Sequence, residues 1–428
     1  MRGIPALATR VAATTLLALG TAGWIGVGCL PWLSSSWTQA VQRDGVEPER
    51  LMWLPWLDAP ARGFARRELQ RGSALRDDTA RKLLEQSARA RPLYAPTWLL
   101  LAELAWRAGE TGRARELAHI AVSLWPGREH LLWSAVALAA EMDEREAALR
   151  LLARIFSAAP ERVDRVVFVG RRLEPDAARL LDGLVPEAER ATPSGQACAI
   201  QLLANAARVG DAALAEAAWR ALDAPARGRR DVLELHVDAL LASGRLGEAV
   251  ALWTQLAPPG LAARGLTDPG FEEAFSQHGL GWRVGSTAGA RSERDPRVRR
   301  EGRFSLGVRF SGGEDVSYLH AAQAFPVEPE RSYRLRGWWR GEELTTPSGP
   351  YLEVVSRSAA GWLQARSAPR LGTWDWSLFE IEFQVPRGVR LLEVRLRRDP
   401  VGEARRGLSG RLWLDDLSLL PEAGEPVP

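Results

Sequence analysis

The first half of the chain repeats its small and apolar residues at a fixed interval. Pro92, Pro126 and Pro160 follow one another 34 residues apart. A period of this length is typical of stacked helix-turn-helix units, each of which buries its apolar face against its neighbours. We therefore predict an α-solenoid over residues 61–260, and we expect Ala118 to be buried between two helices. The repeat units are predicted to begin near Ala61, Ala95, Glu129, Val163, Gln196 and Arg230, and the fourth is interrupted by Pro175 and Pro186.

From about residue 304 the period of the pattern changes to two. Phe379, Ile381 and Phe383 alternate with Glu380 and Glu382, which predicts a strand with one buried and one solvated face. Short strands separated by turn sequences predict an antiparallel β-sandwich or jelly roll over residues 266–420, followed by a tail at 421–428. The fold class is therefore multidomain, α followed by all-β. The other predicted strands are 304–310, 317–325, 332–340, 350–357, 392–396 and 411–420.

Residues 11–33 carry no charge and are numerous enough to cross a hydrocarbon core of about 30 Å as a helix. Only Arg2 and Arg10 are charged before this segment, whereas mixed charges follow it. Since arginines remain on the cytoplasmic side, we predict a bacterial inner-membrane protein with a cytoplasmic N-terminus (1–10), one transmembrane helix (11–33), a juxtamembrane linker (34–60) and a periplasmic remainder. The sequence Gly26-Val27-Gly28-Cys29 resembles a lipobox, so anchoring as a lipoprotein through Cys29 stays open as the alternative.

Charge and residue usage exclude several classes of function. The formal net charge is +3, and acidic residues are interleaved with the arginines, so we expect no nucleic-acid partner. Cys29 and Cys198 are too few for a disulfide framework or a Cys/His metal cluster. The 5 histidines follow no metal-ligand spacing, and no nucleophile elbow or phosphate loop is present. We therefore expect no enzyme activity and no catalytic cofactor.

The spacing of residues within 95–128 resembles the tetratricopeptide (TPR) repeat. The matching residues are Trp98, Ala102, Ala114, Ala118, Ala121 and Pro126. In that family, one face of the first helix of each unit lines a concave groove, which suits an extended peptide or a partner helix. The resemblance therefore implies a protein partner; the alternative is that the tryptophans pack between repeats and the acids are merely solvated. The groove residues that it implies are Leu99, Glu103, Trp106, Arg107, His130, Trp133, Asp231, Glu234 and Asp238.

A second resemblance covers about residues 266–420. The motifs that carry it are Asp268-Pro269-Gly270-Phe271-Glu272, Gly281-Trp282, 302–306, 327–333, Gly372-Thr373-Trp374-Asp375-Trp376 and Trp413-Leu414-Asp415-Asp416-Leu417. Their order resembles that of jelly-roll carbohydrate-binding modules, which implies a polysaccharide partner. In those modules a structural calcium ion often ties the first strand to the last. Glu272 and Asp416 match its ligand positions, and carboxylates are suitable ligands for calcium; the alternative is that the acids form turns and salt bridges.

Aromatic side chains are the candidates for a sugar-binding platform, because the C–H face of a pyranose stacks on a flat ring. In the strand around 334–340, Trp339 shares a face with apolar residues, whereas Trp338 lies on the opposite face among arginines. Core packing does not require Trp338 there, so it is a candidate platform; the alternative is that it packs against the solenoid or a loop. Trp362, Tyr318 and Tyr351 are further candidates.

These features together predict a membrane-anchored, periplasmic adaptor in polysaccharide assembly or export. Its repeats are expected to bind protein, and its β-domain glycan or protein. A purely protein-binding assembly scaffold is the alternative. A glycan-cleaving enzyme is a third interpretation, and it requires a carboxylate pair about 5–10 Å apart in a cleft.

Overall fold

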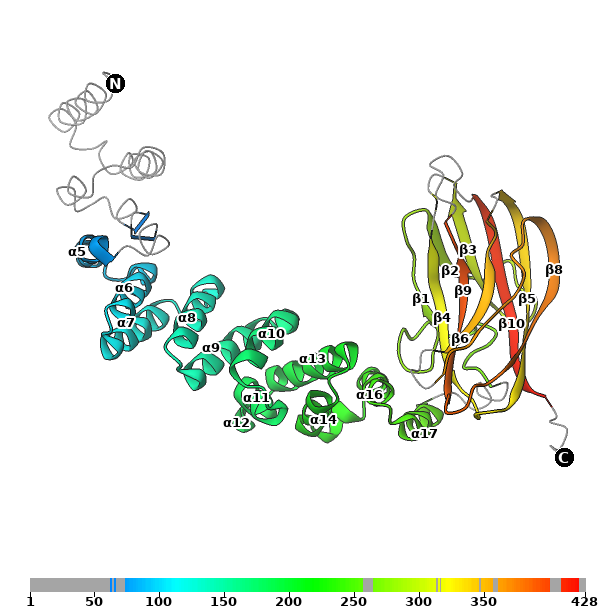
Figure 1. Cartoon of the computed structure of the whole chain (residues 1–428), viewed down its shortest axis with the longest axis horizontal. Coiled ribbons are helices and arrows are strands. Elements are labelled where there is room, and N and C mark those ends of the chain that lie inside the picture. The colour runs from blue at the N-terminus through cyan, green and yellow to red at the C-terminus, as the bar shows by residue number, and fades with distance from the viewer. Residues whose placement is uncertain are drawn as a thin grey trace, which may run out of the picture. The chain divides into compact units, whose positions relative to one another are not determined.

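The computed structural model describes residues 62–63, 65–66, 74–256, 265–312, 315, 317–345, 348–356, 361–400 and 409–422 (Figure 1). The chain divides into two compact units, Met1–Pro186 and Glu187–Pro428. The boundary falls within the fourth predicted repeat, directly after Pro186, one of the two prolines that interrupt the pattern. The described residues of the first unit are helical, and the second unit joins further helices to a β-domain.

The first unit is a series of antiparallel helices. The helices α6, α8 and α10 begin at the positions where the interval predicts the start of a unit. The described helices are α5 (Ala74–Ala90), α6 (Ala95–Arg107), α7 (Thr111–Leu124), α8 (Glu129–Glu141), α9 (Arg145–Ala158), α10 (Val163–Leu173) and α11 (Ala177–Leu184), with a short 3-10 helix at Pro160–Arg162.

The interval of the repeat has a structural cause. Gly109 and Asp143 follow α6 and α8, and both have a positive φ, of 79° and 57°, which ends the first helix of each pair. Ala114 and Ala148 then lie fully buried near the start of the second helix, where a larger side chain would separate the two helices. Ala118 packs against the core cluster of these helices but is only half-buried, so the expectation of a fully buried side chain is confirmed only in part. The next turn of α7 brings Ala121 into that position instead.

The second unit begins with six helices. Thr192 caps α13 by accepting a hydrogen bond from the Gly195 amide at 3.0 Å, and Pro193 provides the first helical residue. The start of this helix therefore precedes Gln196, where the interval places it. The helices are α12 (Glu187–Arg190), α13 (Pro193–Val209), α14 (Ala212–Ala221), α15 (Ala224–Arg227), α16 (Arg230–Ala242) and α17 (Leu246–Leu256).

The β-domain consists of two five-stranded antiparallel sheets, with strand orders β1-β4-β9-β6-β7 and β2-β3-β10-β5-β8. The two sheets face one another in Figure 1. The strands are β1 (Arg283–Val284), β2 (Ala290–Asp295), β3 (Ser305–Ser311), β4 (Tyr318–Pro326), β5 (Ser332–Thr345), β6 (Tyr351–Ser356), β7 (Gln364–Arg366), β8 (Gly372–Gln384), β9 (Leu391–Arg398) and β10 (Ser409–Pro421).

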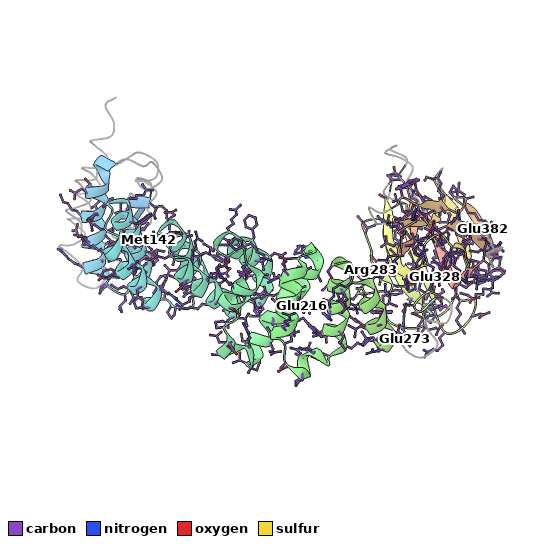
Figure 2. All side chains as sticks on the ribbon, turned by 60° about the horizontal axis from the view of Figure 1, so that its bottom comes forward. Met142, Glu216, Glu273, Arg283, Glu328 and Glu382 are labelled. Atoms are coloured by element: carbon purple, nitrogen blue, oxygen red, sulfur yellow. The ribbon has the colours of Figure 1, made fainter. Side chains whose placement is uncertain are left out.

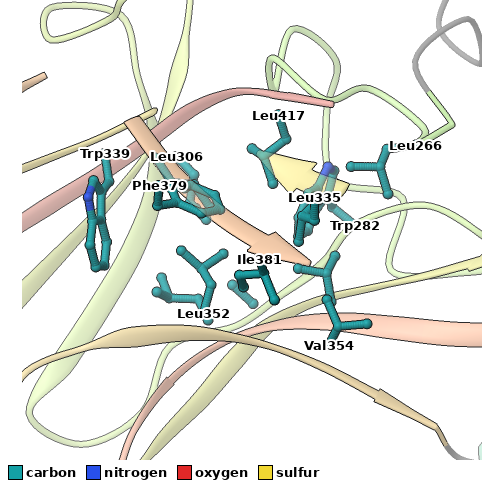
Figure 3. Close-up of a cluster of buried hydrophobic side chains, with 14 of the residues drawn as sticks. Leu266, Trp282, Leu306, Leu335, Trp339, Leu352, Val354, Phe379, Ile381 and Leu417 are labelled. Atoms are coloured by element: carbon teal, nitrogen blue, oxygen red, sulfur yellow. The ribbon is translucent and has the colours of Figure 1, made fainter. Parts of the chain in front are cut away.

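The inner faces of the two sheets form one apolar core (Figure 3). The predicted alternation holds in β8, where Phe379, Ile381 and Phe383 are buried while Glu380 and Glu382 are exposed. A helical region followed by a β-sandwich is thus confirmed.

Among the described residues, none of the helices has the length and apolar character needed to cross a membrane. The predicted span 11–33 and the alternative anchor Cys29 both lie outside the described residues.

Candidate functional site

Trp362 is the aromatic candidate whose ring is accessible to solvent, since the residue is 79% exposed. It lies in the connection between β6 and β7, next to Gly361. A Cβ atom at Gly361 would lie 2.8 Å from Pro386 and 3.0 Å from Val389. Glycine therefore lets this connection lie against the turn between β8 and β9, which fixes the base from which Trp362 projects.

The two tyrosine candidates are buried, which corrects the prediction that they offer stacking surfaces. Tyr318 is fully buried, and its hydroxyl forms a 2.7 Å hydrogen bond with Ser292. Burial raises the Tyr318 pKa to about 12. Tyr351 is 5% exposed and donates a 2.6 Å hydrogen bond to Asp399. Neither ring has a face open to a ligand.

Trp338 and Trp339 occupy opposite faces of β5, as the alternation predicts. Trp339 is buried in the core, and Trp338 is half-buried. The ring of Trp338 does not face solvent freely, because the guanidinium carbon of Arg300 lies 3.8 Å from its centroid. This cation–π contact corresponds to the alternative interpretation, in which Trp338 packs against a loop.

A buried ionic network covers the outer face of the β9–β6 strand pair. Glu353 is only 1% exposed and lies opposite Arg395 in the β6–β9 register. Its carboxylate is 3.6 Å from Arg395 and 3.4 Å from Arg397, and it accepts a 3.0 Å hydrogen bond from Gln364 of β7. Sequence alternation indicated a solvated face here. The acidic residue of β6 and the arginines of β9 could have indicated this network. They do so only once the pairing register of the two strands is known, and the sequence does not reveal that register.

The expected calcium ligands do not fit a metal ion. The Glu272 carboxylate accepts hydrogen bonds from the amides of Arg303 (2.8 Å) and Phe304 (3.2 Å) and from the Arg303 guanidinium. Asp416 pairs with the Arg300 guanidinium at 2.5 Å. Among the described residues, no group of three or more His, Cys, Asp or Glu side chains is arranged to hold a metal. The donor chemistry therefore matches the alternative, turns and salt bridges.

One groove candidate of the first unit, Trp133, forms an arginine–aromatic pair, and a second such pair lies on α10. Trp133 donates a 3.2 Å hydrogen bond to Glu129, and the Arg165 guanidinium lies 4.1 Å from the centre of its ring. On α10, Arg172 lies 4.4 Å from the ring centre of Phe168, which is 60% exposed. The irregular pattern of the fourth repeat did not single out Arg165, Phe168 or Arg172.

The other groove candidates of this unit differ in exposure. Leu99 is buried, and Trp106 is half-buried. Arg107 and His130 are exposed. Glu103 lies 3.7 Å from Arg107, and burial raises the pKa of its carboxyl above the ordinary value.

The three acidic candidates lie on α16, in the second unit, and each has an internal partner. Asp231 pairs with Arg229 at 2.6 Å, and Glu234 pairs with Arg230 at 3.0 Å. Asp238 contacts residues of the segment that leads from the last helix into β1. Its carboxylate is 2.7 Å from His278 Nδ1 and accepts hydrogen bonds from the Gly279 amide (2.8 Å) and from the Arg283 guanidinium (3.2 Å; Arg283 is labelled in Figure 2). Asp238 therefore serves an internal contact, which corrects its assignment to a groove.

Apolar side chains complete this contact between the helices and the β-domain. Trp253 of α17 is 6% exposed and donates a 2.9 Å hydrogen bond to Thr267. Gly279 has a φ of +57°, and a Cβ there would lie 2.4 Å from the Trp253 ring. The positive φ and the close approach both require glycine. The cluster, here called the junction, consists of Val237, Leu240, Ala249, Trp253, Leu280 and Ala324.

No family model matches the chain, and no curated protein matches it. Among solved structures, it is similar to the CBM22-1 xylan-binding domain of Paenibacillus barcinonensis Xyn10C, with 15% identity over 36% of this chain and 93% of that chain and a TM-score of 0.26. It is also similar to a family 16 carbohydrate-binding module, with 18% identity over 38% of this chain and 99% of that chain and a TM-score of 0.26. A third similar structure is TmCBM61 in complex with β-1,4-galactotriose, with 22% identity over 37% of this chain and 99% of that chain and a TM-score of 0.27. These likenesses identify no binding residue in this chain.

Proposed function

We propose that this protein is a non-catalytic adaptor that binds a polysaccharide through its β-domain and a protein through its helices. The observation that carries the glycan half is the Trp362 ring, which is 79% exposed and contributes nothing to the core. A pyranose presents an apolar C–H face that stacks on such a ring. The motifs that resemble carbohydrate-binding modules support the choice of a glycan.

The protein half is supported by the pairs Trp133–Arg165 and Phe168–Arg172 of the first unit. Tryptophan and arginine are the side chains most enriched among the residues that dominate protein interfaces. A partner that is acidic and carries apolar side chains complements both members of each pair. The proposal also includes anchoring in the bacterial envelope through segment 11–33, with a role in polysaccharide assembly or export.

Affinity electrophoresis of the full chain through gels that contain xylan, galactan, glucan or alginate tests the glycan half. The wild type should be retarded by at least one of these polysaccharides. Trp362→Ala should weaken the affinity that causes this retardation about fivefold, since a stacked ring contributes on the order of 1 kcal/mol. Leu371→Ala is the matched control, because it also removes an exposed apolar side chain of the β-domain (45% exposed), and it should migrate like the wild type.

A purely protein-binding scaffold is the second candidate. It is favoured by the internal use of three aromatic candidates, Tyr318, Tyr351 and Trp338. Migration of the wild type unchanged by every polysaccharide would decide for this candidate. Equal retardation of Trp362→Ala and the wild type would instead show that the β-domain binds glycan without the Trp362 ring.

A further inference from the structure

Arg300 connects three parts of the β-domain that are distant in sequence. It belongs to the segment between β2 and β3, and its guanidinium pairs with Asp416 of β10 at 2.5 Å. The same guanidinium covers the ring of Trp338 on β5. Its own amide donates a 2.8 Å hydrogen bond to Asp415. One residue thus joins a loop and two neighbouring strands.

The carboxylates around Arg300 need such a cation. Asp415 is 1% exposed, and the Asp416 side chain is 14% exposed. Two acids side by side at this depth repel each other unless donors or a positive charge compensate them. The Asp415 carboxylate accepts hydrogen bonds from the backbone amides of Arg300 (2.8 Å), Glu301 (3.2 Å) and Asp416 (2.8 Å). The Asp416 carboxylate forms the ion pair with the Arg300 guanidinium.

The backbone of β10 is shaped for this arrangement. Asp416 has a positive φ of 51°, and the pairing register of β10 with β5 shifts between Asp415 and Ser418. A bulge of this kind redirects side chains at the cost of local strain. Here it places Asp415 and Asp416 toward the same loop.

We infer that the Arg300 guanidinium has, in this β-domain, the structural role that a calcium ion has in the modules that its motifs resemble. Glu272, the other expected ligand, is likewise paired with groups of the chain, namely the amides of Arg303 and Phe304 and the Arg303 side chain. The positive charge at this end of the domain is covalently part of the chain. The β-domain therefore folds without a divalent cation. Trp338, on the polar face of β5, stabilises the position of Arg300 by its cation–π contact.

Thermal unfolding of the full chain in millimolar EDTA and in millimolar calcium tests this inference. The melting temperature of the wild type should be the same, within about 1 °C, in both conditions. A calcium site with a micromolar dissociation constant would instead raise it by roughly 10 °C at millimolar calcium. Such a rise, or a fall in EDTA, would overturn the inference.

A second arm uses variants of the cation itself. Arg300→Met keeps the apolar stem over Trp338 but removes the charge, and it should lower the melting temperature by about 5 °C in both conditions. Arg300→Lys should recover part of this loss. Arg291→Met is the matched control, since that side chain is 79% exposed and lies on β2; it should melt like the wild type. Equal melting of Arg300→Met and the wild type contradicts the inference, and the comparison of EDTA with calcium decides it even where Arg300→Met does not fold.

Discussion

Two adjacent tryptophans of β5 show how one residue of displacement changes the role of a side chain. Trp339 is buried against Trp374 and Phe379, with ring centroids 5.7 Å apart in each case. Trp338 points to the other face, where its one described ring contact is with the Arg300 guanidinium. The first ring is part of the core, and the second supports the ion pair between Arg300 and Asp416.

Trp339→Ala should therefore destabilise the β-domain much more than Trp338→Ala. We expect a loss of about 3–5 kcal/mol in the free energy of unfolding for Trp339, as for other large-to-small changes in a core. For Trp338 we expect about 1 kcal/mol, from the lost cation–π contact. Chemical denaturation of both full-chain variants provides the measurement. A loss at Trp338 as large as that at Trp339 would show that both rings belong to the core.

Single residues were the least predictable part of the candidate site. The alternation in β5 correctly separated Trp338 from Trp339, because strand geometry alone determines it. Tyr318 and Tyr351 could not be assigned in the same way. Their burial depends on Ser292 and Asp399, which are 26 and 48 residues away in the chain. No local pattern contains those contacts.

At the scale of elements, the hairpin of α16 and α17 is continuous with the β-domain. Asp238 of α16 binds His278, Gly279 and Arg283 of the segment that leads into β1, and Trp253 of α17 packs in the junction. A fragment that begins at residue 266 would expose Leu280 and Ala324 to water. The β-domain is therefore better studied within 187–428, the full second unit.

The His278–Asp238 contact predicts a dependence of stability on pH. The hydrogen bond to Asp238 raises the pKa of His278 above its ordinary value, although partial burial opposes this. A raised pKa in the folded state means that the stabilisation is complete below about pH 6.5 and is lost as the pH rises through the folded pKa. The melting temperature of the second unit should accordingly contain a contribution from His278 that is present below about pH 6.5 and disappears as the pH rises through the folded-state pKa.

His278→Gln isolates this contribution. Burial lowers the pKa of His236, so its contribution to stability changes with pH in the opposite direction. Burial also raises the pKa of Asp415, to about 6. Both remain in the variant, so the difference between the wild type and His278→Gln belongs to His278. That difference should shrink as the pH rises. His130→Gln changes a histidine of the first unit and should leave the melting temperature of the second unit unchanged. A difference that is constant from pH 6.5 to 8.5 contradicts the ionic role of His278.

The elements themselves were largely predictable, because their causes are local. The interval of the repeat follows from the positive φ after α6 and α8 and from the buried alanines Ala114 and Ala148. The period of two in β8 follows from its single buried face. The junction was not predictable, since Asp238 carries the pattern of a solvated helix face and its partners lie 40 residues or more beyond it.

On the scale of the whole molecule, each unit has its own apolar core. The first unit contains the cluster of Ala95, Leu99, Ala102, Ala121 and Leu131 with its neighbours. The second contains the sandwich core and the junction. A core of this kind supports cooperative unfolding of the unit that contains it.

Calorimetry of the full chain should therefore resolve two transitions, and one substitution in each unit should identify them. Ala121 is fully buried in α7, so Ala121→Arg forces a charge into a close helix contact and should abolish the transition of the first unit. Trp253→Ala removes the largest side chain of the junction and should lower the transition of the second unit by about 10 °C. Each substitution should leave the other transition in place. Loss of both transitions in Ala121→Arg would mean that the chain unfolds as one cooperative body, and the proposed glycan-binding and protein-binding parts could then not be varied independently.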